Sequence, residues 1–286
     1  MRRWPGVSFS GRWAPKLRVP PHPLPEGKPI VFEPWLPALV AGVFGLALGS
    51  FLNVCSMRWP VDESVVAPRS RCPGCGKGIV WYDNVPVLSW ILLRGRCRRC
   101  GERISVQYPL VELATGAIWA GMVMLYGMEW EALRGATFLT ILLGIAVSDA
   151  RFYIIPDQFS VGGAILGFAM AFMPGGIDWL AGLAGALTGF LLLWFVAWAG
   201  EKVFKKEAMG GGDIKMMALI GVFVGITGVL LTIFLGSLLG AVIFGPISMK
   251  TGKMIPFGIF LALGAAVTFL FGEALIGWYL GWAYPA

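Results

Sequence analysis

Residues 136–157 read ATFLTILLGIAVSDARFYIIPD, an apolar run that ends close to an acidic residue, Asp149. A second apolar run follows the segment MGGGDIKMM of residues 209–217, in which Asp213 comes directly after three glycines. Carboxylates at the edge of hydrocarbon are rare and generally mark a functional site. Two carboxyl groups that face each other can share one proton near neutral pH, which is what aspartic proteolysis requires. Asp149 and Asp213 are therefore the candidate catalytic residues.

The composition is that of a membrane protein. Hydrophobic residues make up 57% of the 286 residues and charged residues only 14%, whereas soluble domains carry about 25% charged residues. The apolar runs lie near residues 36–56, 109–127, 133–149, 159–174, 179–200, 214–227, 229–248 and 256–280. We expect an all-α polytopic membrane protein with about eight transmembrane helices, although the runs that begin at 159 and 214 are short for a crossing of roughly 20 residues.

Glycines recur within the later apolar runs. They include Gly162, Gly163, Gly182, Gly185, Gly189, Gly236 and Gly240. Small residues at such spacings let transmembrane helices approach each other closely. We therefore expect close helix packing at these positions, with hinges as the second interpretation.

Lys and Arg residues gather on one side of the expected spans. The loop of residues 57–108 carries nine, the segment just before Asp213 carries three, and residues 249–255 carry two, whereas the connections at 128–132 and 175–178 carry none. Positive residues favour the cytoplasmic side, so we expect the loop and both aspartates at the cytoplasmic edge of the membrane. The net charge of +7 follows from this asymmetry, and no motif supports a nucleic-acid partner.

The chain is expected to have four parts. Residues 1–33 form an N-terminal extension, 34–56 the first transmembrane helix, 57–108 the cytoplasmic loop and 109–286 the transmembrane core. The extension carries six Lys and Arg residues, which disagrees with a first span that runs from outside to inside. It is rich in proline and lacks an apolar stretch of signal-peptide length, so we expect a poorly ordered segment and not a cleaved targeting peptide.

The loop contains two Cys-x2-Cys pairs, separated by 21 residues and each followed by glycine. The four residues are Cys72, Cys75, Cys97 and Cys100. Two such knuckles can close a tetrahedral zinc site, although the separation is one residue longer than usual. The alternative is a pair of disulfides, which a reducing cytoplasm disfavours. Four thiolates leave no open position, so the zinc is expected to be structural. Cys55, at the end of the first span, is expected to be a small buried apolar side chain.

Several further motifs occur in a fixed order along the chain. They are GSFLNVC at residues 49–55, the two cysteine knuckles, WYDNVPVLSW at 81–90, QYPLVE at 107–112, the segment from Asp149 to Asp157, and Gly210-Gly211-Gly212-Asp213. Together they resemble the type IV prepilin leader peptidase/N-methyltransferase family of GxGD-type membrane aspartic proteases. The resemblance runs from about residue 42 to residue 280, and no single motif carries it alone.

This resemblance implies a bifunctional enzyme of the bacterial inner membrane. Members cleave the basic leader of type IV prepilins and type II secretion pseudopilins after a glycine at the cytoplasmic face. They then methylate the new N-terminal residue with S-adenosylmethionine. The two catalytic aspartates of the family fall on Asp149 and Asp213.

Other residues near the two aspartates are candidates for supporting roles. Gly210, Gly211 and Gly212 could form a platform that an extended peptide approaches closely, or a plain turn between helices. Asp157 could be a third acid, although capping of the next helix is the more ordinary interpretation. Lys215 could tune Asp213 or could be an interfacial lysine that reaches the headgroups.

A site for S-adenosylmethionine is harder to find in the sequence. No Gly-x-Gly-x-x-Gly segment follows a strand, so the site must be built from the loop and the span ends. Weak candidates are Asp83 and Asn84, within an aromatic segment, and Glu112. The aromatic residues could instead be interfacial anchors, and Glu112 could pair with a loop arginine.

Two other classes of protein would also contain some of these features. An ion-coupled transporter places acids in its spans, but usually near mid-membrane within inverted repeats, which we do not find. A zinc-loop membrane scaffold would keep the cysteines without needing the acids. We favour the peptidase, with a peptidase that lacks methyltransferase activity as the nearest alternative.

Overall fold

The computed structural model describes residues 35–206, 209–251 and 256–283. The long helices are α1 (Trp35–Arg58), α3 (Gln107–Tyr126), α4 (Trp130–Phe152), α5 (Asp157–Met170), α6 (Trp179–Phe204), α7 (Gly211–Thr251) and α8 (Phe257–Ala283). The loop between α1 and α3 holds the short helices η1 (Trp59–Val61), η2 (Trp81–Asn84) and α2 (Leu88–Leu92). The expected extension at residues 1–33 lies outside the described residues.

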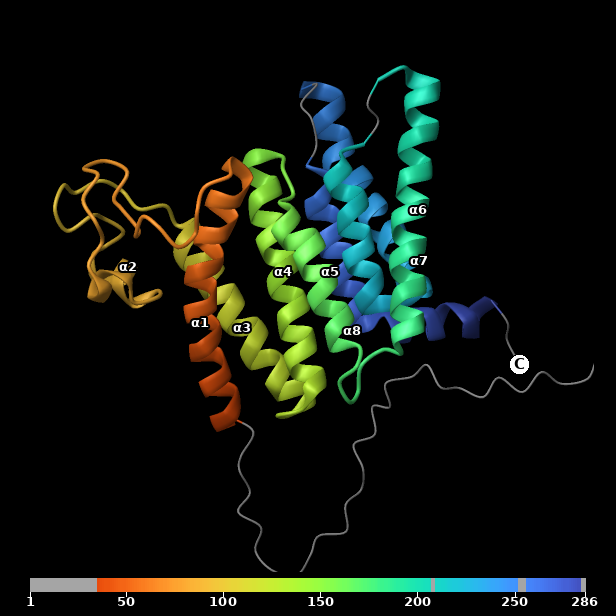
Figure 1. The fold of residues 1–286 in the computed structure, drawn as a ribbon, viewed down its shortest axis with the longest axis horizontal. Coiled ribbons are helices and arrows are strands. Elements are labelled where there is room, and N and C mark those ends of the chain that lie inside the picture. The colour runs from red at the N-terminus through yellow and green to blue at the C-terminus, as the bar shows by residue number, and fades with distance from the viewer. Residues whose placement is uncertain (1–34, 207–208, 252–255, 284–286) are drawn as a thin grey trace, which may run out of the picture. The chain divides into compact units, whose positions relative to one another are not determined.

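The chain divides into two units. The larger one, Glu33–Gly272, holds the bundle of helices drawn in Figure 1, whereas the last part of α8, from Glu273 onward, belongs to the other unit. Short connections join α3 to α4, α4 to α5 and α5 to α6, so successive helices run in opposite directions. We call the end of the bundle where α1 ends and α3 begins the loop end, and the opposite end the far end.

The helix α7 reverses its direction at Gly225, whose φ of 68° and ψ of −173° interrupt the helical backbone. At the loop end, Gly212 and Gly258 both lie against the side chain of Ile155. Gly240 also lies against α8, within one turn of Gly258. A straight helix would separate residues 212 and 240 by about 42 Å. Because both lie near the start of α8, the two halves of α7 form a hairpin whose turn is at the far end.

The crossings agree with the predicted apolar runs. Within the described ranges, six helices are long and apolar enough to cross a membrane: α1, α3, α4, α6, α7 and α8. Because α7 reverses direction, its two halves are two crossings. The 14-residue helix α5 adds a further, short crossing. In the described part of the chain this gives eight crossings, and the two short apolar runs are α5 and the first half of α7.

Glycines bring helix backbones into contact, as predicted. A Cβ atom on Gly185 of α6 would lie 2.3 Å from the carbonyl oxygen of Gly221 in α7. Likewise, a Cβ on Gly49 of α1 would lie 2.7 Å from the Cα atom of Glu112 in α3. Gly162 differs, because a Cβ there would meet nothing within 4 Å. Close packing is therefore the role of the first two glycines but not of Gly162.

A partly buried arginine supports the reversal of α7. Arg134 of α4 donates a hydrogen bond of 2.6 Å from Nη2 to the carbonyl oxygen of Phe223, and its guanidinium lies 5.6 Å from the centre of the Phe223 ring. The same ring stacks on Phe138 at 4.3 Å. Phe223 lies two residues before Gly225, where carbonyls lose their helical partners. Arg134 thus satisfies a carbonyl that the reversal exposes, and it links α4 to α7.

Two serines link α1 to α4 near the loop end. Ser148 Oγ donates to the carbonyl oxygen of Ser56 at 3.3 Å, and Ser56 Oγ donates to the carbonyl oxygen of Gly144 at 3.2 Å. Both serines are fully buried. Buried hydroxyl groups need such partners, and the pair holds in place the turn of α4 that carries Asp149.

Candidate active site and metal centre

Asp149 lies in the last turns of α4 and points at the start of α8. Asp149 is only 5% exposed. Its Oδ2 atom accepts a hydrogen bond of 3.1 Å from the backbone N–H of Ile259. The first N–H groups of a helix have no partner within the helix and carry a partial positive charge, so they favour a carboxylate. A Cβ on Gly258 would lie 2.8 Å from Oδ2, so a larger residue at this position would displace the carboxylate.

Asp213 lies in the first turn of α7, next to the three glycines. Its N–H donates to the carbonyl oxygen of Gly210 at 3.2 Å. A Cβ on Gly212 would lie 3.0 Å from the Cβ of Ile155, whereas a Cβ on Gly211 would meet nothing within 4 Å. None of the three adopts a positive φ. What Gly210 and Gly211 provide is therefore open space beside Asp213, and not an unusual backbone conformation.

The structure brings together two aspartates from α4 and α7, which are separated in the sequence by α5 and α6. The side chain of Ile155 contacts both Gly212, which precedes Asp213, and Gly258, which covers Asp149. The carboxyl groups lie near enough for the charge of Asp149 to act on Asp213. Asp149 is buried and Asp213 is partly exposed. One carboxyl group is therefore held within the bundle, while the other remains reachable from the loop end.

Asp157 and Lys215 form an ion pair beside this site. Lys215 Nζ lies 2.7 Å and 2.8 Å from the two carboxylate oxygens of Asp157, and both side chains are exposed. Asp157 is the first residue of α5, and the N-cap position before it is Pro156, which has no side-chain acceptor. Its charge still favours the helix N-terminus. Lys215 thus pairs with Asp157 and links α5 to α7 at the loop end.

The four cysteines of the loop form one cluster. Their Sγ atoms all lie within 4.8 Å of one another, and those of Cys72 and Cys100 are 3.6 Å apart. In each knuckle the first cysteine donates its N–H to a carbonyl five residues later and accepts at its carbonyl from the glycine that follows the second cysteine. These glycines, Gly76 and Gly101, have φ values of 66° and 74°. Such an arrangement of four sulfur atoms can hold a tetrahedral metal ion.

The backbone around the second knuckle favours a thiolate. Hydrogen bonds from the N–H groups of Cys100 and Arg99 lower the pKa of Cys97 to about 6. The thiolate is the form that binds metal, so these hydrogen bonds favour metal binding at Cys97.

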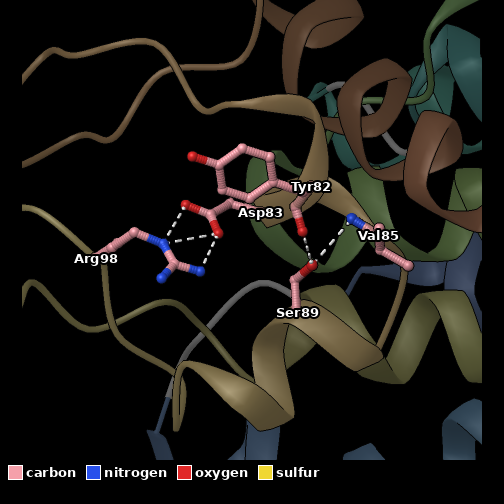
Figure 2. Close-up of polar contacts among 5 residues, drawn as sticks. All are labelled: Tyr82, Asp83, Val85, Ser89 and Arg98. Atoms are coloured by element: carbon pink, nitrogen blue, oxygen red, sulfur yellow. Dashed lines mark hydrogen bonds and ion pairs between the residues drawn. The ribbon is translucent and has the colours of Figure 1, made fainter.

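Asp83, one of the candidate cofactor residues, binds the second knuckle instead. Figure 2 shows Arg98, which lies between Cys97 and Cys100, reaching the Asp83 carboxylate. The three hydrogen bonds are 2.7 to 3.0 Å long, and the guanidinium also lies 5.6 Å from the centre of the Tyr82 ring. The ion pair raises the pKa of Arg98. Asp83 thus fastens η2 to the cysteine cluster.

Glu112, the second candidate, holds the other end of the aromatic segment. It is buried, and its Oε2 atom accepts a hydrogen bond of 2.7 Å from the N–H of Val87. Val87 has a φ of 59°, a strained conformation for a β-branched residue. Between these points, Ser89 Oγ donates to the Tyr82 carbonyl and accepts from the Val85 N–H (Figure 2). Asn84, the third candidate, is exposed.

Some of these residues could not have been found from the sequence. Arg98 is one of nine basic residues in the loop and has no distinguishing neighbour. Ile259 acts through its backbone N–H, which any residue carries. For Gly258, the preceding Pro256 and Phe257 suggest only the start of a helix.

Two family models match the chain. The model described as the bacterial peptidase A24 N-terminal domain matches residues 43–126, and the one described as the type IV leader peptidase family matches residues 136–245. The first covers most of α1, the loop and α3, and the second covers most of α4, all of α5 and α6, and most of α7. The two aspartates thus fall within the second match and the four cysteines within the first.

Relatives with the name prepilin leader peptidase/N-methyltransferase match most of the chain. That of Bacillus subtilis (strain 168) is 34% identical over 249 residues, covering 83% of this chain and 96% of the relative. That of Aeromonas hydrophila is 33% identical over 275 residues, covering 86% and 95%. That of Myxococcus xanthus (strain DK1622) is 41% identical over 214 residues, covering 75% of this chain but only 64% of the relative. No solved structure matches the chain significantly.

Proposed function

Since the chain belongs to the type IV leader peptidase family, we propose that it is a membrane aspartic endopeptidase that cleaves the leader peptides of type IV prepilins and type II secretion pseudopilins. The observation that carries this proposal is the meeting of Asp149 and Asp213, from two different helices, at one end of the bundle. A transporter would instead need its acids near the middle of the spans, and a scaffold would not need them to meet.

The proposed mechanism uses the two carboxyl groups as one unit. One carboxylate takes a proton from water while its protonated partner polarises the scissile carbonyl, and no covalent intermediate forms. The Ile259 N–H donates to Oδ2 of Asp149, which fixes the orientation of that carboxyl group at the start of α8. Because one proton is shared, the cleavage rate should fall on both sides of its pH optimum.

The open space beside Asp213 suits an extended substrate. A helical peptide hides its peptide bonds, so the scissile segment must unwind before water can reach it. Gly210 and Gly211 present no side chain where such a segment would approach. Gly212, packed on Ile155, keeps Asp213 at a fixed distance from Asp149. In this proposal the first two glycines admit the substrate and the third positions the acid.

The cytoplasmic face of the bacterial inner membrane is the proposed location of the site. The loop with its nine basic residues joins the bundle at the same end as both aspartates. Positive residues stay on the cytoplasmic side, and the basic leader of a prepilin lies there too.

The family also implies N-methylation of the new N-terminus with S-adenosylmethionine. The residues present do not define a site for this cofactor: the carboxylates of Asp83 and Glu112 are both taken up by protein donors, and Asn84 is exposed. We therefore propose the activity from the family and derive no step through the cofactor. The alternative is a peptidase without the second activity.

The four cysteines fit a structural zinc ion better. Each can supply one thiolate, and the cluster has the size of a tetrahedral site. Zinc held by four thiolates has no free position for water or substrate, so it would stabilise the loop and supply no chemistry.

A co-expression experiment tests the peptidase. The chain is expressed in membranes with a candidate prepilin, and the mature N-terminus is read by mass spectrometry. Asp149→Asn and Asp213→Asn should each abolish cleavage. With one asparagine in place, the two side chains can no longer share a proton that one donates and the other accepts. Asp178→Asn is the matched control, since Asp178 only caps α6 at the far end through Ala181 and asparagine caps equally well. Normal processing by either dyad variant would eliminate the aspartic mechanism.

A further inference from the structure

The short helix α2 lies at the depth of the transmembrane helices. Its entry is fixed by the hydrogen bond from the Val87 N–H to Glu112. Glu112 is the sixth residue of α3, so it lies about 7 to 8 Å inside the loop end. The polar boundary at that end is marked by Gln107, whose Oε1 accepts from Arg151. In Figure 1, α2 lies level with α1 and not beyond its loop end.

One face of α2 is apolar and uncovered. Leu88, Ile91 and Leu92 are 53%, 58% and 71% exposed. The side chains on α3 at the same depth, Leu110 and Leu113, are also exposed and apolar. A surface of this kind is costly in water, and in a protein that crosses a membrane it continues the lipid-facing surface of the helices.

The backbone of this segment is already paired within the protein. The N–H of Val85 donates to Ser89 Oγ, and the N–H groups of Ser89, Ile91 and Leu93 donate to carbonyl oxygens four residues earlier. The chain then turns at Arg94, where the N–H groups of Arg94 to Arg96 also find carbonyl partners. Irregular backbone enters hydrocarbon only when its polar groups are satisfied in this way.

We propose that α2 is inserted into the bilayer leaflet at the loop end, with Leu88, Ile91 and Leu92 in contact with lipid acyl chains. The flanking arginines Arg94 and Arg96 are exposed and lie where long cationic side chains can reach lipid phosphates. Part of the segment 57–108, expected to be a cytoplasmic loop, is then a membrane anchor. Through Ser89, η2 and the Asp83–Arg98 pair, this anchor holds the cysteine cluster at a fixed place beside the bundle.

Fluorine NMR on the full chain tests the insertion. Trifluoromethyl-phenylalanine is encoded at position 92, 91 or 66, in vesicles of phosphatidylethanolamine and phosphatidylglycerol. Val66 is the matched control, because it is an apolar loop residue that is 86% exposed and its N–H donates to Ser64 Oγ within the same loop. Relaxation by dissolved oxygen reports contact with lipid, and relaxation by a water-soluble nickel chelate reports contact with water.

We expect labels at positions 91 and 92 to respond more strongly to oxygen than to the chelate, and the label at position 66 to show the reverse. A chelate-dominated response at 91 and 92, equal to that at 66, would overturn the proposal. Loss of chelate access at these positions only after a pilin is added would also overturn it, since the apolar face would then be a docking site for protein. Neither result depends on peptidase activity.

Discussion

The replacement Gly185→Ala should separate α6 from α7 and destabilise the bundle. The new Cβ would lie 2.3 Å from the Gly221 carbonyl oxygen, 2.7 Å from the Cα of Gly225 and 2.9 Å from its carbonyl carbon. An ordinary contact is at least 3.4 Å, so the helices must move apart by about 1 Å at this point. All three atoms belong to the backbone, and no side-chain rotation can relieve the overlap.

The magnitude follows from two opposing effects. Alanine in place of glycine stabilises a helix by roughly 1 kcal/mol. Overpacking of a well-packed interior costs about 1 to 3 kcal/mol, and contacts between backbones belong to the upper part of this range. Gly162→Ala is the matched control, because its Cβ meets nothing within 4 Å and only the favourable effect remains. Both variants gain the helix stabilisation, so they should differ by the overpacking cost alone, about 2 to 3 kcal/mol.

Thermal unfolding of both variants in the same detergent measures this difference. We expect Gly185→Ala to unfold several degrees below Gly162→Ala, and to cleave more slowly, since α7 carries Asp213. If Gly185→Ala were as stable as Gly162→Ala, the backbone contact between α6 and α7 would be looser than the structure has it, and the reasoning would fail.

Three further outcomes are expected. Cys72→Ser should release the bound zinc and expose the loop to proteases, since binding energy on the order of 10 kcal/mol is lost; elemental analysis checks this, and wild-type protein purified without zinc would contradict it. Asp83→Asn should speed the loss of zinc to a chelator, because the charge that holds Arg98 is removed, whereas Asp62→Asn, at an exposed loop position, should not; equal rates would count against the link. Asp149→Asn should still methylate a pre-cleaved peptide from labelled S-adenosylmethionine, and failure to do so would argue for one shared site.

The sequence predicted the crossings well because hydropathy is a local property. Each apolar run corresponds to a helix or to half of α7, since in lipid the backbone must satisfy its own hydrogen bonds. The knuckles were equally predictable, because the Cys-x2-Cys spacing and the glycine that follows each pair both favour the turn that the structure shows. The positions of Asp149 and Asp213 at span ends followed from the same local reading.

Contacts between distant segments could not be predicted in this way. Asp149 and Ile259 are 110 residues apart, and nothing in either segment specifies the other. Asp83 was a candidate for the cofactor because it lies in an aromatic segment, and Glu112 was one because it is a carboxylate near the membrane edge. The structure shows that protein donors occupy both, and only a three-dimensional arrangement can show that an acceptor is already used.

The reversal of α7 explains why the site needs all of its parts. A straight α7 would carry its last residue about 39 Å past the far end, and α8 could not begin at the loop end. The N–H of Ile259 would then be absent from Asp149, whose buried carboxylate would lack a donor. Gly225 permits the reversal because its φ of 68° is disfavoured for other residues, and Arg134 satisfies the carbonyl left open beside it. The far end of the bundle, with no acid of the dyad in it, thus determines whether the dyad can assemble at the loop end.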